Sequence, residues 1–452
     1  MAEISEQTKT PDKLELFVQA LEQGTLNEVR RQLGELHPAE IAHILESIPA
    51  EARETVWELL PAEPTGEILL HLNEELRARL MERMAPEDLV AATEGLDTDD
   101  LADILPAMPE QVVQEVMLAL EEQERQRLES VLSYPEDTAG GLMDLDTLVV
   151  RGDISLDVVL RYLRWRREIP ETTDTLFVVN RDGKYMGLLT LRDLLTNDPT
   201  LTVAELMQRD VEGIPADMPD WEVAQLFQHR DLVTAPVVDS DGKLLGRITI
   251  DDVVDVIRDD ADHSLMSMAG LTEEEDMFSP VLKSARRRTL WLGVNLLTAF
   301  LASWVIAQFD ATIEKLVALA ILMPIVASMG GIAGSQTLTL VVRGLALGQI
   351  SKSNARQLLR KELLVGVLNG LIWAVVIAGV ASLWFDNTPL GVVIAAAIVV
   401  NLFVAALAGA LVPLMLRRFG ADPALAGSVV LTTVTDVVGF LAFLGLATLF
   451  LL

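Results

Sequence analysis

The sequence predicts a multidomain, mainly α-helical protein with three parts: an α-superhelical N-terminal domain, an α/β tandem repeat and a polytopic membrane domain with five helical spans. Three observations predict this fold class. A period of 12 residues runs through 36–132, two later segments match at a constant offset of 59 residues, and long apolar stretches fill the chain after residue 288. Short internal periods are typical of stacked repeats, and apolar runs of about 20 residues can cross a bilayer.

The N-terminal period predicts a stack of short helices in an acidic domain at 12–133. Each unit starts with an apolar residue, continues with Pro or a polar residue, and then turns acidic, as in LHPAE, IPAEA and MAPED. Pro and acidic residues in a first turn are helix-start signals. Stacking is expected to bury the apolar positions between neighbouring units. These positions are Leu36, Ile48, Leu60, Leu72, Met84, Leu96, Met108, Leu120 and Leu132.

The tandem repeat predicts two small α/β domains in succession. The segments 176–195 and 235–254 both read as a strand, an Asp-Gly-Lys turn, a second strand and a helix. An Asp-Gly pair between two apolar runs is a strong hairpin signal. The predicted domains are 134–201 and 202–260.

Five apolar stretches predict a membrane domain at 289–452, preceded by a linking helix at 261–288. Each stretch approaches or exceeds the length that a helix needs to cross the bilayer core. The second contains PIVASMGGIAGSQ, whose glycines allow either a break in the helix or close packing of another backbone. The predicted spans are roughly 289–309, 316–342, 363–385, 390–416 and 425–452.

The basic residues of the loops predict the orientation. All but one lie before the first span, between the second and third, or between the fourth and fifth. The positive-inside rule places these loops in the cytoplasm. We therefore expect a multi-pass protein of the cytoplasmic (inner) membrane with a cytoplasmic N-terminus and an external C-terminus.

Charge separates the two parts of the chain. Of the 35 basic and 67 acidic residues, 24 and 61 lie in 1–285, a net charge of −37 there against +5 for the remainder. So acidic a surface excludes nucleic acid as a partner and favours cations. The chain has no Cys, which excludes disulfides and thiolate metal sites. No nucleophile–base pair or phosphate-binding loop indicates an enzyme.

Asp436 is the only ionisable residue inside the last apolar stretch. A carboxylate at bilayer depth costs about 2.5–3.5 kcal/mol and usually faces a partner, a cavity or an ion path. No basic residue lies deep enough in the other stretches to pair with it. The expected counter-charge is therefore a mobile cation. The alternative is a neutral carboxyl group that is hydrogen-bonded to Thr432 or Thr433, one turn back.

The tandem repeat strongly resembles a pair of cystathionine-β-synthase-type (CBS) domains. In such pairs a Thr-x-x-Asp after the second strand often holds a nucleotide ribose. Thr249 and Asp252 match this pattern and are the candidates for a nucleotide such as ATP. The alternative is that the two side chains only cap the following helix.

The order of segments resembles the MgtE family of magnesium channels. It consists of the acidic helical repeat, YPEDTAGGLM at 134–143, the CBS pair, GGIAGSQ in span two and DPALAGSVVLTTVTDVVG at 422–439. The resemblance covers nearly the whole chain from about residue 12. It implies a homodimer in the lipid bilayer, a pore at the two-fold axis, selective import of Mg²⁺, and closure by Mg²⁺ bound to the cytosolic domains.

The resemblance also implies site residues. Asp436 resembles the pore carboxylate of the family, and Thr432 a pore-lining neighbour. Mg²⁺ bridging the acidic faces of the cytosolic sensor would compact that part and close the pore through the linking helix. The residues that resemble the family's sensor are Asp99, Asp103, Asp231, Asp255 and Asp260.

Two positions depart from the family pattern and leave ion selectivity open. Ile332 stands where Asn usually follows the paired glycines, and Val429 stands where Pro is usual. One alternative is therefore a divalent-cation transporter of broader selectivity, including Co²⁺ or Mn²⁺, although softer metals normally require imidazole or thiolate ligands. A second alternative is a membrane-anchored CBS sensor of nucleotides or ions that transports nothing.

Overall fold

The computed structural model forms two compact units, Met1–Ala261 with Glu274–Ser279 and Asp262–Glu273 with Pro280–Leu452. The side chains of residues 98, 99, 123 and 124 are not described, and the predicted domain start at residue 12 lies outside the described residues. The structure describes residues 17, 26–60, 64–96, 98–166, 169–170, 172–272, 276–351 and 353–452.

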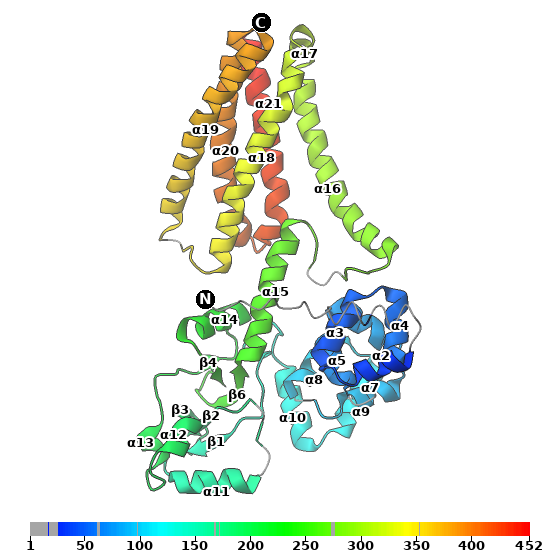
Figure 1. The fold of residues 1–452 in the computed structure, drawn as a ribbon. Coiled ribbons are helices and arrows are strands. Elements are labelled where there is room, and N and C mark those ends of the chain that lie inside the picture. The colour runs from blue at the N-terminus through cyan, green and yellow to red at the C-terminus, as the bar shows by residue number, and fades with distance from the viewer. Residues whose placement is uncertain are drawn as a thin grey trace, which may run out of the picture. The chain divides into compact units, whose positions relative to one another are not determined.

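The first unit begins with the short helices that the 12-residue period predicts (Figure 1). Pro occupies the first turn of two of them, and the side chains of His37 and Asn73 accept hydrogen bonds at two helix starts. The period residues Ile48, Leu72 and Met108 are buried, whereas Leu132 is exposed, against the prediction. The helices are α2 (Leu26–Leu33), α3 (Pro38–Ser47), α4 (Ala50–Glu58), α5 (Thr65–Leu70), α6 (Glu74–Met81), α7 (Pro86–Thr93), α8 (Thr98–Ile104), α9 (Glu110–Ala119) and α10 (Glu122–Val131), with a 3₁₀ turn at Leu105–Ala107.

The tandem repeat folds as two three-stranded sheets of the same topology. In each sheet the first two strands are parallel and the last two form an antiparallel hairpin. The pairing of Thr175 with Thr190 recurs 59 residues later as Thr234 with Thr249. The strands are β1 (Val149–Arg151), β2 (Thr175–Val179), β3 (Tyr185–Thr190), β4 (Ile214–Pro215), β5 (Thr234–Val238) and β6 (Leu244–Thr249). The helices between them are α11 (Leu156–Arg166), α12 (Leu191–Thr196), α13 (Val203–Leu206) and α14 (Asp220–Arg230).

The two hairpin turns pair with each other, which joins the repeats. The backbone N–H of Tyr185 donates to the carbonyl of Gly242 at 2.9 Å, and that of Leu244 to Gly183 at 3.1 Å. Gly183 and Gly242 both have a φ of 79°, a left-handed conformation that glycine adopts without strain. The predicted Asp-Gly-Lys turns are therefore present and equivalent.

The predicted linking helix at 261–288 is divided. Helix α15 (Ile250–Met268) ends before the middle of that range, and α16 begins only at Val281. The segment after the break is bound within the first unit, where Asp276 is buried in a two-pronged ion pair with Arg53 at 2.5 and 2.8 Å. Ser279 also donates a hydrogen bond to Glu75. A continuous linking helix is therefore wrong, because part of this polar stretch packs against the N-terminal helices instead.

The second unit contains five helices long and apolar enough to span a membrane, as predicted (Figure 1). Helix α20 is central: it packs against α18, α19 and α21, and more than half of its most apolar segment is buried, against about a tenth in α16. A short helix, α17 (Asp310–Lys315), occupies a loop where no element was expected. The five helices are α16 (Val281–Ala307), α18 (Ala318–Ala346), α19 (Ala355–Phe385), α20 (Thr388–Arg418) and α21 (Pro423–Phe450).

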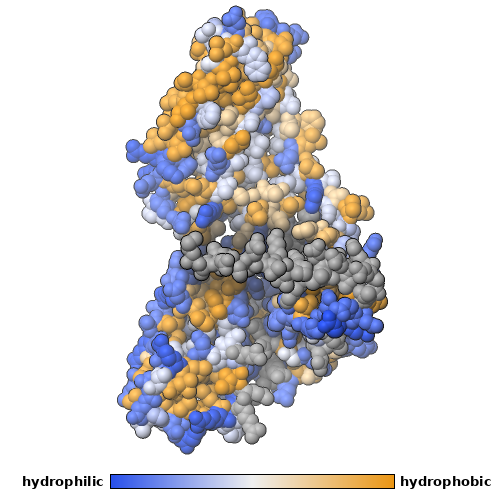
Figure 2. Space-filling view, in the orientation of Figure 1, coloured by the Kyte–Doolittle hydropathy of each residue, from blue (hydrophilic) through white to orange (hydrophobic). Residues whose placement is uncertain are grey.

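The outer surface of the five-helix unit is apolar, as a lipid-facing surface must be. Helix α19 exposes Leu368, Val375, Leu383 and Trp384 among other large apolar side chains. Figure 2 shows hydrophobic residues along α19 and hydrophilic residues gathered toward its N-terminal end. This distribution places the apolar middle of the helix in the hydrocarbon layer and its polar end at the interface.

Gly330 and Gly334 of α18 allow close packing, and the helix is not broken at them. Helix α18 is continuous through Gly330 and Gly331, although Pro324 lies inside it. A Cβ added to Gly334 would lie 2.7 Å from the side chain of Leu431 in α21. Of the two interpretations of this motif, the structure supports the second.

Candidate functional site

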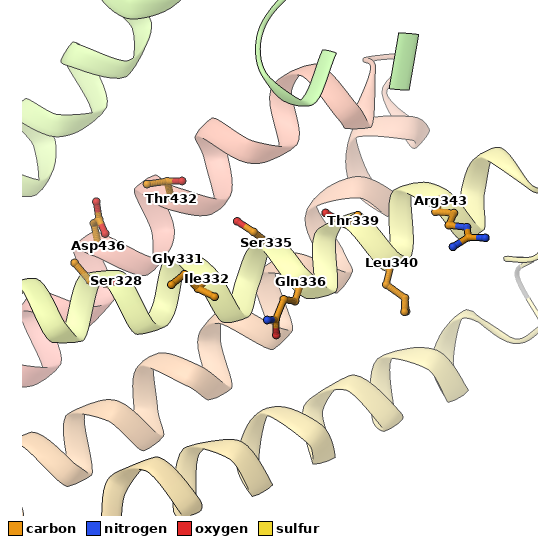
Figure 3. A pocket seen from close by; sticks show the side chains of 11 residues that line it. Ser328, Gly331, Ile332, Ser335, Gln336, Thr339, Leu340, Arg343, Thr432 and Asp436 are labelled. Carbon is orange, nitrogen blue, oxygen red and sulfur yellow. The ribbon is translucent and has the colours of Figure 1, made fainter. Parts of the chain in front are cut away.

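A cavity of about 890 Å³ lies along one face of α18 and is closed on one side by α21. The residues from α18 recur at intervals of three or four, which places them on one stripe of that helix. Figure 3 shows Asp436 and Thr432 on α21 facing this stripe, with Asp436 beside Ser328. The lining residues are Ala327, Ser328, Gly331, Ile332, Ser335, Gln336, Thr339, Leu340, Arg343, Thr432 and Asp436.

Asp436 has no protein partner in the described part of the chain. It lines the cavity, is partly buried, and accepts no hydrogen bond and no ion pair from the described residues. The alternative of a carboxyl group bound by Thr432 or Thr433 is not found. Those hydroxyl groups donate instead to the carbonyl oxygens of Ser428 and Val429, at 2.9 and 2.7 Å.

The threonine hydroxyl groups of α21 are oriented by their own helix. Because Thr432 donates its proton to Ser428 O, its oxygen has lone pairs left to accept hydrogen bonds or to face a cation. Thr435 donates in the same way to the carbonyl of Thr432, at 3.0 Å. The cavity wall next to Asp436 therefore presents oxygen acceptors, which suit a hard cation or the water molecules around one.

Arg343 is the only basic residue that lines the cavity, at the opposite end from Asp436 (Figure 3). It lies 15 residues after Ser328 on α18, about 22 Å along a helix. At that separation Arg343 cannot neutralise Asp436. The cavity thus has an anionic end, a polar middle lined by Ser335, Gln336 and Thr339, and a cationic end.

Of the two departures from the family pattern, one lies in the cavity. Ile332 lines it with an exposed apolar side chain. Val429 is buried and is not among the lining residues. The first departure can therefore act on an ion directly, and the second only through helix packing.

The sequence analysis missed Glu362 of α19, a buried carboxylate in the five-helix unit. It accepts hydrogen bonds from Thr337 at 3.3 Å and from the adjacent Lys361 at 2.8 Å. It lines a smaller cavity of about 180 Å³ that also reaches Gln336, a residue of the larger cavity. Glu362 directly precedes the predicted start of the third span. The adjacent Lys361 was the available signal, because neighbouring opposite charges indicate an ion pair at the membrane–water interface.

The structure brings some of the predicted sensor residues together. Desolvation by burial raises the pKa of Asp103 to about 6, and the negative charges of Glu136 and Asp255 act in the same direction. The positive charge of Arg77 opposes this shift. Desolvation raises the pKa of Asp220, and the negative charges of Asp137 and Asp260 add to it. Two acidic groups thus form in the first unit, one around Asp103 and one around Asp220.

The remaining two sensor candidates are Asp231 and Asp99. Asp231 ends α14 in a left-handed conformation with a φ of 50°, and the side chain of Asp99 lies outside the described part. Among the described residues, no three His, Asp or Glu side chains converge closely enough to hold a metal ion unaided.

Thr249 and Asp252 form a helix cap in the structure. The hydroxyl and backbone N–H of Thr249 donate to the Asp252 carboxylate at 3.0 and 3.3 Å, at the start of α15. Desolvation, the charge of Asp251 and the charge of Asp103 raise the pKa of Asp252 to about 7, although the bonds from Thr249 oppose this. Thr190 and Asp193 make the equivalent cap in the first repeat.

Fold and site together define a multi-pass membrane protein with a helical domain, a CBS pair and a cavity between two of its spans that is lined by hydroxyl groups and the Asp436 carboxylate. The chain belongs to the MgtE family. It matches the family's divalent cation transporter domain at residues 323–446, its intracellular N domain at 36–137, and CBS domains at 139–199 and 203–259.

Relatives from two bacteria match over almost their full length. A magnesium transporter MgtE of Thermus thermophilus is 34% identical, with 97% of this chain and 99% of the relative covered. One of Bacillus subtilis is 28% identical, with 98% and 99% covered. A solved structure of the cytosolic domain of the Mg²⁺ channel MgtE in complex with ATP is 36% identical, with a TM-score of 0.48, and covers 54% of this chain and 99% of that one.

Proposed function

We propose that this protein imports Mg²⁺ across the cytoplasmic membrane through a path that passes Asp436 and Thr432. The observation that carries the proposal is a membrane carboxylate that faces a cavity of about 890 Å³ and has no partner among the described residues. Buried charges without a partner are costly, so a cation in transit is the natural counter-charge. Membership of a family of divalent cation transporters supports this assignment.

The chemistry of the lining favours a hard divalent cation. The cavity offers carboxylate, hydroxyl and amide oxygens, and no His or Cys is among its lining residues. Mg²⁺ gives up its water reluctantly, and a wide, oxygen-lined cavity can accept it with part of its hydration shell. Two relatives are magnesium transporters by name. Broader selectivity that includes Co²⁺ or Mn²⁺ is the first alternative, because Ile332 replaces a polar residue of the family pattern.

The working unit is proposed to be a homodimer. Each chain has one carboxylate at this depth of α21, and a two-fold axis beside that helix would bring two Asp436 side chains to one ion path. The distribution of basic loop residues supports a cytoplasmic position for the first unit, called the soluble unit below, and an external C-terminus.

Closure by cytosolic Mg²⁺ is the proposed regulation. Burial is the main cause of the raised pKa of Asp103, and the negative charges of Glu136 and Asp255 add to it, so these carboxylates repel each other when they are ionised. A divalent cation between the N-terminal helices and the CBS pair would relieve it. Asp99, Asp231 and Asp260 are kept as further ligands in this proposal.

ATP binding at Thr249 and Asp252 is the least supported part of the proposal. The two side chains cap α15 through each other, so a ribose would have to compete for the Asp252 carboxylate. A CBS sensor without transport is the alternative from a different class. It gives no role to a carboxylate that faces a cavity among the spans.

The proposal is tested by flux through purified protein in liposomes, with Mg²⁺, Ca²⁺, Co²⁺ and Mn²⁺ compared at equal concentration. We expect Mg²⁺ to be carried best and its flux to fall when Mg²⁺ is added on the side of the soluble unit. Neutralising Asp99, Asp103, Asp255 and Asp260 together should keep the flux and remove that inhibition. Protein that carries no divalent cation would support the sensor alternative.

A further inference from the structure

A buried amide lies behind the cavity. Asn401 of α20 has no exposed surface, and its Nδ2 donates a hydrogen bond of 2.8 Å to the carbonyl oxygen of Val326 in α18. Its Oδ1 is buried with no hydrogen-bond partner among the described residues. An amide that uses only part of its hydrogen-bonding capacity is costly in an apolar interior.

Two glycines make room for this amide, one on each helix that forms the cavity. A Cβ added to Gly330 of α18 would lie 2.3 Å from Nδ2 of Asn401, and one added to Gly439 of α21 would lie 2.8 Å from it. Real Cβ atoms do not approach other atoms this closely. The side chain of Asn401 is therefore held between the backbones of α18 and α21.

The turns that hold Asn401 are the turns that build the cavity. Ala327 and Gly331 line the cavity and directly follow Val326 and Gly330, which contact the amide. Asp436 lies three residues before Gly439, about 4.5 Å along the helix axis. A shift of either turn against the amide would therefore move the cavity wall or the carboxylate.

We propose that Asn401 is a positioning residue: it fixes α18 and α21 relative to each other so that the Asp436 carboxylate stands at the correct place for a cation in the cavity. This inference rests on the proposed function of the cavity as an ion path. Packing alone does not require an amide here, because a leucine would fill a similar volume without burying an unpaired oxygen.

A glycine pair on α21 tests the inference through ion flux. Gly439→Ala should push on the amide, whereas Gly445→Ala adds a Cβ with nothing within 4 Å. We expect Gly439→Ala to raise the half-saturating Mg²⁺ concentration about tenfold, a typical size for coupling between residues in direct contact such as Gly439 and Asn401. Gly445→Ala should leave this concentration unchanged. A Cβ at Gly439 would also lie 3.2 Å from Val326 Cγ1, so Gly439→Ala should keep only a smaller effect in an Asn401→Ala background, where the amide is gone. Equal effects of Gly439→Ala in both backgrounds would overturn the inference.

Distance measurements test the same inference without transport. Spin labels on cysteines introduced at Leu340 in α18 and Val430 in α21 of this Cys-free chain report the spacing of the two helices. Asn401→Leu should shift or broaden the distance distribution. The control Asn295→Leu should not, because among the described residues the Asn295 amide bonds its own helix alone, to Trp291 O at 3.0 Å.

The two readouts separate the inference from the proposed function. A wild-type protein without Mg²⁺ flux would refute the proposed function, and the distance measurement would still decide the role of Asn401. Asn401→Ala also removes the donor to the Val326 carbonyl and replaces Asn401→Leu if that variant elutes as an aggregate in gel filtration. An unchanged helix spacing in the folded Asn401 variant would overturn the inference.

Discussion

At the scale of single residues, Asp252 and Asp436 differ in their hydrogen-bond partners. The Asp252 carboxylate accepts the hydroxyl and the backbone N–H of Thr249 and so completes a helix cap. Asp436 has threonines at the same short range, but their hydroxyl groups donate to carbonyl oxygens of their own helix. The first carboxylate stabilises a helix start, whereas the second has no hydrogen-bond partner among the described residues.

The raised pKa of Asp103 predicts a pH dependence of the soluble unit. Its folded-state pKa of about 6 lies above the ordinary value of about 3.9, so the folded unit holds this proton more tightly than the unfolded chain. Stability from this group therefore falls as the pH rises from about 4 to about 6. Without divalent cations, the thermal midpoint of the soluble unit should rise when the pH is lowered from about 8 to about 5.5, a range that spans the shifted pKa.

The variant Asp103→Asn should flatten this pH dependence, and Asp182→Asn in an exposed hairpin turn is the matched control. Mg²⁺ added at the higher pH should also raise the midpoint of the wild type, because a bound cation offsets the negative charges of Asp103, Glu136 and Asp255. A pH profile that Asp103→Asn leaves unchanged would mean that the acidic group around Asp103 is only a solvated surface.

At the scale of elements, the segment between α15 and α16 is held by the N-terminal helices. Asp276 is buried against Arg53, and the guanidinium of Arg53 also lies 5.6 Å from the ring centre of Phe278. Desolvation would raise the pKa of Asp276, but hydrogen bonds from Arg53 and Phe278 and the charges of Arg53 and Arg79 outweigh it and lower the pKa. Because α16 starts at Val281, the N-terminal domain binds the segment that directly precedes the first span.

Breaking this ion pair should release the segment. Arg53→Met removes the closer ion pair of a buried carboxylate and leaves Asp276 with Arg79 at 3.7 Å and the Phe278 N–H. Breaking a buried pair typically costs about 3–5 kcal/mol, so the variant should make residues 276–279 sensitive to protease. Arg83→Met is the matched control, because the pair of Arg83 with Glu54 is exposed and should contribute less than about 1 kcal/mol. Replacing both partners, as Arg53→Met with Asp276→Leu, should recover part of the loss. Equal protease sensitivity of Arg53→Met and the wild type would contradict the anchoring role.

The elements show what the sequence could predict and where it failed. The five spans, the CBS hairpins and the N-terminal helices follow from local patterns, namely apolar length, the Asp-Gly turn and helix-start signals. The break after Met268 has local signals that were overlooked, Gly270 with a φ of 73° and Pro280 directly before α16. The burial of Asp276 could not be predicted, because it depends on a contact with Arg53, 223 residues earlier in the chain. Glu362 was missed because apolar length places the start of a span just beyond it. Asp436 could be predicted as a cavity residue because it is a charged residue in an apolar segment. The contact of Asn401 with two glycines could not be predicted, because it forms only when three helices pack together.

At the scale of the whole molecule, the distribution of basic residues predicts which side each loop faces. Cysteines introduced at Asn387, between α19 and α20, and at Gln349, between α18 and α19, lie on opposite sides in this topology. In intact cells an impermeant maleimide should label the cysteine at Asn387 but reach the one at Gln349 only after permeabilisation. The reverse pattern would invert the orientation. Loss of the Asn387 cap, which accepts from Leu390 N at 3.0 Å, should cost only about 1 kcal/mol.

The most direct test of the ion path is Mg²⁺ flux through Asp436→Ala protein in liposomes, measured beside the wild type and the control Asp386→Asn. Asp386 ends α19 in a left-handed conformation that Asn also tolerates, so this control removes a carboxylate outside the spans without disturbing the helix. We predict that Asp386→Asn carries Mg²⁺ like the wild type. Asp436→Ala should be folded and inserted in the membrane but carry almost no Mg²⁺. Wild-type Mg²⁺ flux through Asp436→Ala would contradict it.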